Sequence, residues 1–119
     1  MANTDLARLR ACVGTEPVLL VSVGQQQGSV PREQGAWMGV TATTVIGTVG
    51  GGHLEWEAIA HARALLSDPP QGPTKRHFKL GPSLGQCCGG ALDLEFVYLP
   101  SDLPAASAQS LFQRLKPPS

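Results

Sequence analysis

The sequence predicts an α+β fold: a mixed β-sheet of about five strands, a long helix after a Gly-Gly-Gly turn, and short flanking helices. Three observations predict this class. The chain has 119 residues, of which 42% are apolar and 15% charged, so it can build one packed core. Several short segments are continuously apolar or alternate between apolar and polar residues, which is typical of strands. Other segments place apolar residues at helical spacing.

The first third of the chain predicts a helix, a strand and a loop, in that order. Residues 4–13 carry apolar side chains at helical spacing before Gly14, which favours a short amphipathic helix. Residues 18–23 are almost all apolar, as in a strand covered on both faces, so a central strand is expected there. Residues 24–35 are rich in Gln, Gly and Pro and predict a polar loop.

The middle of the chain predicts a β-hairpin followed by the long helix. Residues 36–41 and 44–49 are rich in Val, Ile, Thr and Trp and are close enough to pair. The helix is expected over residues 53–66, because four apolar residues fall on one stripe: Leu54, Ala58, Ala62 and Leu65. The Pro-rich segment 68–73 ends it.

The last third predicts two alternating strands, over residues 74–80 and 92–99, with a glycine-rich loop between them. If these strands pair, their opposite charges can face each other across the ladder, Lys75 and Lys79 against Asp93 and Glu95. A weak helix is expected over residues 105–116, before a Pro-rich end.

The charges and cysteines exclude several classes of function. Nine Lys and Arg residues balance nine Asp and Glu residues, so no broad positive field draws nucleic acid or an anionic membrane. The longest apolar run is far shorter than the roughly 20 residues that cross a bilayer. The start lacks the features of a secretory signal, and three cysteines, two of them adjacent, make a poor disulfide framework. A cytoplasmic location is expected.

Three motifs can carry chemistry. In the first, Gly50, Gly51 and Gly52 lead from a strand into a helix at His53, and such a terminus favours an anion such as phosphate. A tight turn without a ligand explains the pattern equally well. In the second, Pro31 stiffens a loop in which Arg32 offers a planar charged group to phosphate or carboxylate, although a solvated arginine is the simpler interpretation.

The third motif is the adjacent pair Cys87 and Cys88, flanked by Gln86 and by glycines that leave the thiols accessible. A zinc site using these thiols with His53 and His77 is the competing hypothesis. The spacing argues against it, because structural zinc sites usually take pairs of ligands two to four residues apart. Cys12 is interpreted as a small core residue and His61 as a surface or half-buried one.

Taken together, the three segments resemble the XdhC/CoxI family. They are GSVPREQGAWM at 28–38, GTVGGGHLE at 47–55 and LGPSLGQCCGG at 80–90. The Gln-Cys-Cys-Gly-Gly sequence, together with His53 after the triple glycine, looks like the xanthine dehydrogenase accessory branch of that family. The resemblance implies a family domain over residues 1–100. It also implies that residues 101–119, a short helix and Pro-rich tail, would link to a Rossmann-like domain outside this chain.

The resemblance further implies a non-catalytic chaperone that transiently binds molybdenum cofactor (molybdopterin), supports its sulfuration and delivers it to a xanthine-dehydrogenase-type enzyme. The implied partners are apo-xanthine dehydrogenase and a cysteine desulfurase. Neither nucleic acid nor a membrane is an expected partner. A homodimer is possible. In this hypothesis Cys87 and Cys88 contact the molybdenum or its sulfur, and Gln86 helps to orient the cofactor. Arg32 and the Gly50–Gly52 turn hold the phosphate side of the cofactor, and Ser29 and His53 are further binding residues.

Two alternatives stay open at this stage. In one, a cysteine carries a persulfide whose sulfur passes to the cofactor, and a protein-bound sulfane sulfur would reveal it. In the other, the chain is a docking domain that binds the dehydrogenase or the desulfurase without touching cofactor. Normal partner binding without cofactor affinity would reveal that second case.

Overall fold

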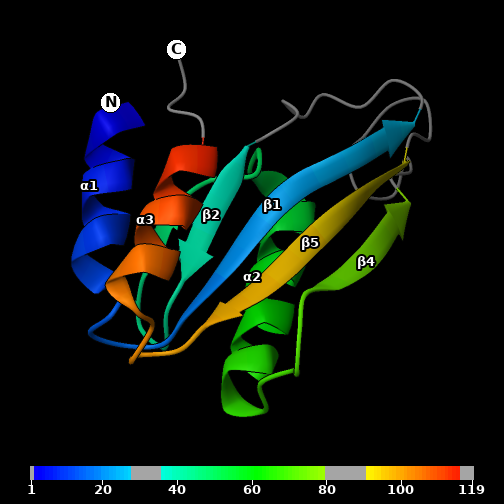
Figure 1. Cartoon of the computed structure of the whole chain (residues 1–119). Coiled ribbons are helices and arrows are strands. Elements are labelled where there is room, and N and C mark those ends of the chain that lie inside the picture. The colour runs from blue at the N-terminus through cyan, green and yellow to red at the C-terminus, as the bar shows by residue number, and fades with distance from the viewer. Residues whose placement is uncertain (1, 28–35, 80–90, 116–119) are drawn as a thin grey trace.

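A computed structural model describes residues 2–27, 36–79 and 91–115 of the chain. Within these residues the fold is one five-stranded sheet with helices on both faces (Figure 1). The strands are β1 (Val18–Gln27), β2 (Trp37–Val40), β3 (Val45–Gly47), β4 (Thr74–Lys79) and β5 (Ala91–Leu99). The helices are α1 (Ala2–Cys12), α2 (Gly52–Ser67) and α3 (Ala105–Arg114). The predicted α+β class is confirmed.

The strand order is β3-β2-β1-β5-β4, so the apolar run at 18–23 lies in the centre of the sheet, as expected. All four strand pairings are antiparallel, which corrects the expectation of a mixed sheet. The two strands on either side of α2, β3 and β4, do run in the same direction. They lie at opposite edges of the sheet and never pair, because α2 crosses the whole face between them.

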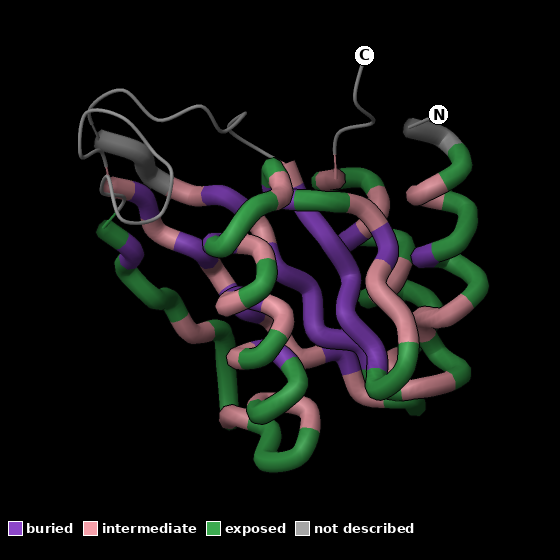
Figure 2. Tube along the Cα trace, turned by 180° about the vertical axis from the view of Figure 1, so that it is seen from behind, coloured by how far each residue is buried: buried purple, intermediate pink, exposed green. Residues whose placement is uncertain are grey.

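The core has two layers, one on each face of the sheet. On one face, Leu54, Ala58 and Ala62 of α2 pack against alternate residues of β1 and β5, such as Val21 and Phe96. This is the apolar stripe that the sequence predicts, and all three helix residues are buried. On the other face, α1 and α3 cover a second cluster that contains Leu9, Trp37 and Leu111. Figure 2 shows the buried residues concentrated in the central strands.

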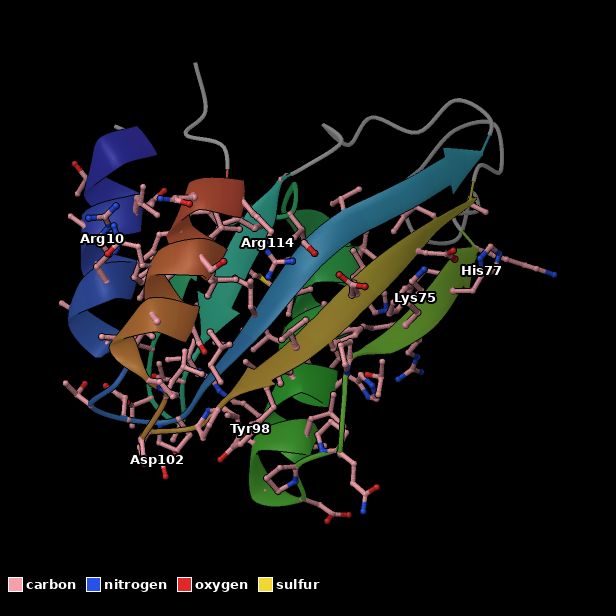
Figure 3. The ribbon with its side chains drawn as sticks, in the orientation of Figure 1. Arg10, Lys75, His77, Tyr98, Asp102 and Arg114 are labelled. Carbon is pink, nitrogen blue, oxygen red and sulfur yellow. The ribbon has the colours of Figure 1, made fainter. Side chains whose placement is uncertain are left out.

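The outer face of the β4–β5 pair carries charged side chains. Lys75 lies opposite Glu95, as the sequence predicts. Lys79 does not face an acidic residue, because the observed register puts Ala91 opposite it. Asp93 is instead opposite His77, and the His77 Nδ1 and Asp93 Oδ1 atoms are 2.7 Å apart. Lys75 and His77 both project from this edge strand (Figure 3).

In the part of the chain that the structure describes, no helix is long and apolar enough to cross a membrane.

Candidate functional site

The strands that lead into the three motif segments share one direction. Every pairing in the sheet is antiparallel, so β1, β3 and β4, which alternate with β2 and β5, run the same way. The chain therefore leaves the ends of β1, β3 and β4 in the same direction. These are the points from which the segments 28–38, 47–55 and 80–90 start. The end of β3 lies further back than the other two, because Gly47 is opposite Met38, which is opposite Val21 in the middle of β1.

The register places the ends of β1 and β4 on either side of the start of β5. Gln27, the last residue of β1, is opposite Ala91, the first residue of β5. Ala91 is in turn opposite Lys79, the last residue of β4. The returning chain is also held close, because the Val23 N–H donates to the Ala36 carbonyl at 2.9 Å. Gln27, Ala91 and Lys79 are therefore neighbours on adjacent strands, while Ala36 lies beside Val23, further back along β1.

Five of the predicted site residues lie outside the described residues: Ser29, Arg32, Gln86, Cys87 and Cys88. The four that the structure places are Gly50, Gly51, Gly52 and His53, at the start of α2. In the described residues, no group of three or more His, Cys, Asp and Glu side chains is arranged to hold a metal ion. The zinc hypothesis therefore gains no support from His53 or His77, which lie on α2 and on β4.

The triple glycine is required by its backbone conformation. The φ angles of Gly50, Gly51 and Gly52 are 117°, 78° and 74°, a region that side chains with a Cβ rarely adopt. A Cβ added at Gly51 or Gly52 would meet nothing within 4 Å. No described residue therefore fills the space above the Cα atoms of these two glycines, and a flat group could approach the backbone closely there.

Glu55, one turn into α2, holds this turn in place. Its Oε1 atom accepts hydrogen bonds from the N–H groups of Val49 and Gly51, each at 3.0 Å. The Thr48 hydroxyl also donates to Glu55. A carboxylate near a helix N-terminus is stabilised by the partial positive charge of that terminus. The protein's own carboxylate thus occupies the Gly51 N–H, one of the donors that the sequence suggested for a phosphate.

His53 and Trp56 form an aromatic pair on the first turns of α2. Their ring centroids are 5.9 Å apart and the rings are inclined by 29°. The His53 Nε2 atom is 2.7 Å from Oε1 of Glu57, which fixes the orientation of the imidazole. The Trp56 side chain is 68% exposed, and no other large apolar side chain in the described ranges is exposed.

The sequence analysis did not assign a role to Glu55, Thr48 or Trp56. A glutamate soon after a helix start is the available signal for Glu55, since such residues often reach back to the first N–H groups. Trp56 lies off the apolar stripe of α2, which is the signal that it does not belong to the core.

The described residues also form one shallow pocket of about 280 Å³ at the opposite end of the sheet. Its lining residues are Glu16, Pro17, Ala42, Arg63, Leu66 and Ser67. The Arg63 Nε–H donates to the Thr41 carbonyl at 3.2 Å, so this arginine ties α2 to the turn between β2 and β3. Within the described residues, the pocket lies away from the ends of β1 and β4, and its one arginine already has a structural use.

Cys12 lies on α1, where it packs partly buried against the second core cluster. Burial raises the pKa of its thiol, and the neighbouring Glu16 carboxylate raises it further. A thiol whose pKa is raised is a poor nucleophile and a poor metal ligand. This supports the interpretation of Cys12 as a structural residue.

The comparisons with known proteins agree with this architecture. The family model described as "XdhC and CoxI family" matches residues 13–78, more than half of the chain. A solved structure from Bacillus halodurans, described as a xanthine dehydrogenase, is similar in fold, with a TM-score of 0.66 and 22% sequence identity. The match covers 92% of this chain and 33% of that one, so the chain spans about a third of that protein's length. No curated protein matches the sequence.

Proposed function

Because the chain belongs to the XdhC and CoxI family, we propose that it binds molybdenum cofactor, supports its sulfuration and delivers it to a xanthine-dehydrogenase-type enzyme. The observation that supports it best is the arrangement of the sheet, in which Gln27, Lys79 and Ala91, the residues next to the Arg32 and Cys87–Cys88 segments, lie side by side.

The described residues fit a flat cofactor at the glycine turn. Gly51 and Gly52 leave open space where a side chain would otherwise stand. In the proposed site, Cys87 and Cys88 hold the molybdenum side, with Gln86 orienting the cofactor. Arg32 and Ser29 bind its phosphate side, and His53 with the Gly50–Gly52 turn borders the ring system. The bound cofactor supplies a redox-active molybdenum centre to the client enzyme.

The chain's own residues would perform binding and protection and no chemical step. Thiolates suit a soft metal centre, and the Arg32 guanidinium suits a phosphate. The Glu55 carboxylate keeps the N–H groups of Val49 and Gly51 for itself. The phosphate is therefore assigned mainly to Arg32. The proposed partners are apo-xanthine dehydrogenase and a cysteine desulfurase in the cytoplasm, with self-association into a dimer as a further property to measure.

The test is an anaerobic titration of the chain with molybdenum cofactor, followed by absorbance. The double variant Cys87→Ser/Cys88→Ser is compared with Cys12→Ser, a matched control that removes the remaining thiol of the chain. We expect saturable binding in the wild type and in Cys12→Ser, and a loss of binding of at least tenfold in the double variant. Circular dichroism checks that all three proteins are folded.

The same proteins are then tested for activation of apo-xanthine dehydrogenase. Cofactor binding and activation that are unchanged in the double variant would contradict the assignment of Cys87 and Cys88. A chain that binds the dehydrogenase normally but has no affinity for cofactor would contradict the binding proposal and favour a docking role.

A further inference from the structure

Trp56 is an exposed tryptophan beside the open glycine turn. It lies four residues after Gly52 on α2, so the two share one stripe of the helix surface, about one turn apart. Helical side chains lean toward the N-terminus of their helix, over the residues three and four positions earlier. For Trp56 these are His53, with which it stacks, and Gly52, which has no side chain. The indole therefore lies beside the His53 ring, and it leaves the space over Gly52 unfilled.

The His53 ring supports the indole from one side. Its contact with Glu57 holds the imidazole in place, and the imidazole in turn limits the rotation of Trp56. The space over Gly52 remains open, since an added Cβ would touch nothing within 4 Å. The surface thus combines a supported, exposed aromatic ring with a bare stretch of backbone. Such a surface suits a flat ring.

The hydrogen bonds of the turn point to the ring of a ligand and not to its phosphate. The N–H groups of Val49 and Gly51 already donate to Glu55, and the Gly50 N–H donates to the Thr48 hydroxyl at 3.0 Å. These amides are therefore engaged within the protein. The start of α2 adds to these amides an exposed aromatic surface, the Trp56 indole beside His53.

We propose that Trp56, supported by His53, is a stacking platform for a planar fused heteroaromatic ring of the pterin class at the glycine turn. This inference rests on the proposed function and adds to it the residue that contacts the ring. Stacking of heteroaromatic bases on protein aromatic rings stabilises binding enough to change affinity on the order of tenfold or more when the aromatic is removed.

The two tryptophans of the chain allow a direct test by fluorescence. Trp37 is 6% exposed in the core on the other side of the sheet, whereas Trp56 is 68% exposed. The probe is 6-carboxypterin, which has the ring without molybdenum, and inorganic phosphate serves as the ligand without a ring. The variants are Trp56→Leu, Trp56→Phe and the control Trp37→Phe.

We expect the pterin to quench emission saturably in the wild type and in Trp37→Phe, but not in Trp56→Leu. Calorimetric affinity for the pterin should fall about tenfold or more in Trp56→Leu and recover partly in Trp56→Phe, which keeps a ring. Phosphate should not quench. Pterin binding with the same affinity in Trp56→Leu would overturn the platform, as would the absence of any saturable quenching in the wild type.

A parallel titration with molybdenum cofactor separates this inference from the proposed function. Cofactor binding that is equally tight in Trp56→Leu would overturn the platform while leaving the function intact. An absence of cofactor binding by the wild-type chain would instead count against the proposed function. If Trp56→Leu loses only its binding to the dehydrogenase, Trp56 is a protein contact and the platform is wrong.

Discussion

At the scale of single residues, Glu55 is the side chain on which the glycine turn most depends. Three glycines with positive φ angles are flexible in the unfolded chain, so ordering them has a large entropic cost. The Glu55 carboxylate offsets part of that cost with hydrogen bonds to two backbone N–H groups and one hydroxyl. The open surface above Gly51 and Gly52 therefore exists because a residue further along the helix holds the turn.

We predict that Glu55→Ala lowers the free energy of unfolding by about 2 kcal/mol, the usual scale for hydrogen bonds to a charged group. The control is Glu57→Ala, which removes a half-exposed carboxylate whose partner is His53. Its effect should stay below about 1 kcal/mol, because solvent weakens surface ion pairs. Urea denaturation followed by circular dichroism measures both. Equal effects of the two variants would show that Glu55 does not hold the turn.

At the scale of elements, a contact between two side chains joins α2 to the edge strand β4. Arg76 Nη1 lies 3.1 Å from Nδ1 of His61, and the His61 ring packs edge-on against Phe96 with centroids 4.8 Å apart. Because Arg76 can only donate, this contact needs a neutral imidazole that accepts at Nδ1. Burial lowers the pKa of His61, and the positive charge of Arg76 lowers it further.

This contact makes the stability of the fold depend on pH. The folded state binds a proton at His61 less readily than the unfolded state, whose pKa is near the ordinary 6.5. The contribution of His61 is therefore complete above that pH and is lost as the pH falls below it. We predict that the melting temperature of the wild type falls more between pH 7.5 and 5.5 than that of His61→Gln, which stays neutral. Identical pH profiles in the two proteins would refute the assignment.

At the scale of the whole molecule, the second helical layer is held by close packing between residues far apart in sequence. Leu9 of α1 is fully buried and lies over Gly39 of β2. A Cβ at position 39 would stand 2.8 Å from the Leu9 Cδ1 atom and 3.5 Å from Cγ1 of Val18. The absence of a side chain at position 39 therefore allows α1 to pack closely on the sheet.

We predict that Gly39→Ala destabilises the protein by about 1–3 kcal/mol, the usual range for overpacking a buried site. Gly72→Ala is the control, because a Cβ there meets nothing within 4 Å. Leu9→Ala should cost about 2–5 kcal/mol through the cavity it leaves. The double variant should be less destabilised than the sum of the two single variants, because Leu9→Ala removes the side chain with which the methyl group at position 39 would clash. Additive effects in chemical denaturation would argue against this packing.

The local patterns were sufficient to predict most elements. The helix predicted over residues 53–66 is found at Gly52–Ser67, and the central strand predicted over 18–23 is found within Val18–Gln27. The predicted hairpin is confirmed by the pairing of Met38 with Gly47. These succeed because apolar periodicity reflects burial, which the sequence carries residue by residue. The roles of Cys87, Cys88 and Arg32 remain predictions.

The sequence by itself therefore determined the class of the fold, the approximate position of most elements and the family to which the motifs belong, although it assigned residues 24–27 to a loop and they extend β1. Only the tertiary structure decided the pairing of the strands and the use of the glycine turn. Strand direction depends on which edge α2 reaches, and no local pattern encodes that choice. Likewise, the Val49 and Gly51 amides could have served a phosphate, but the Glu55 carboxylate folds back onto them and leaves Trp56 as the exposed neighbour of the turn.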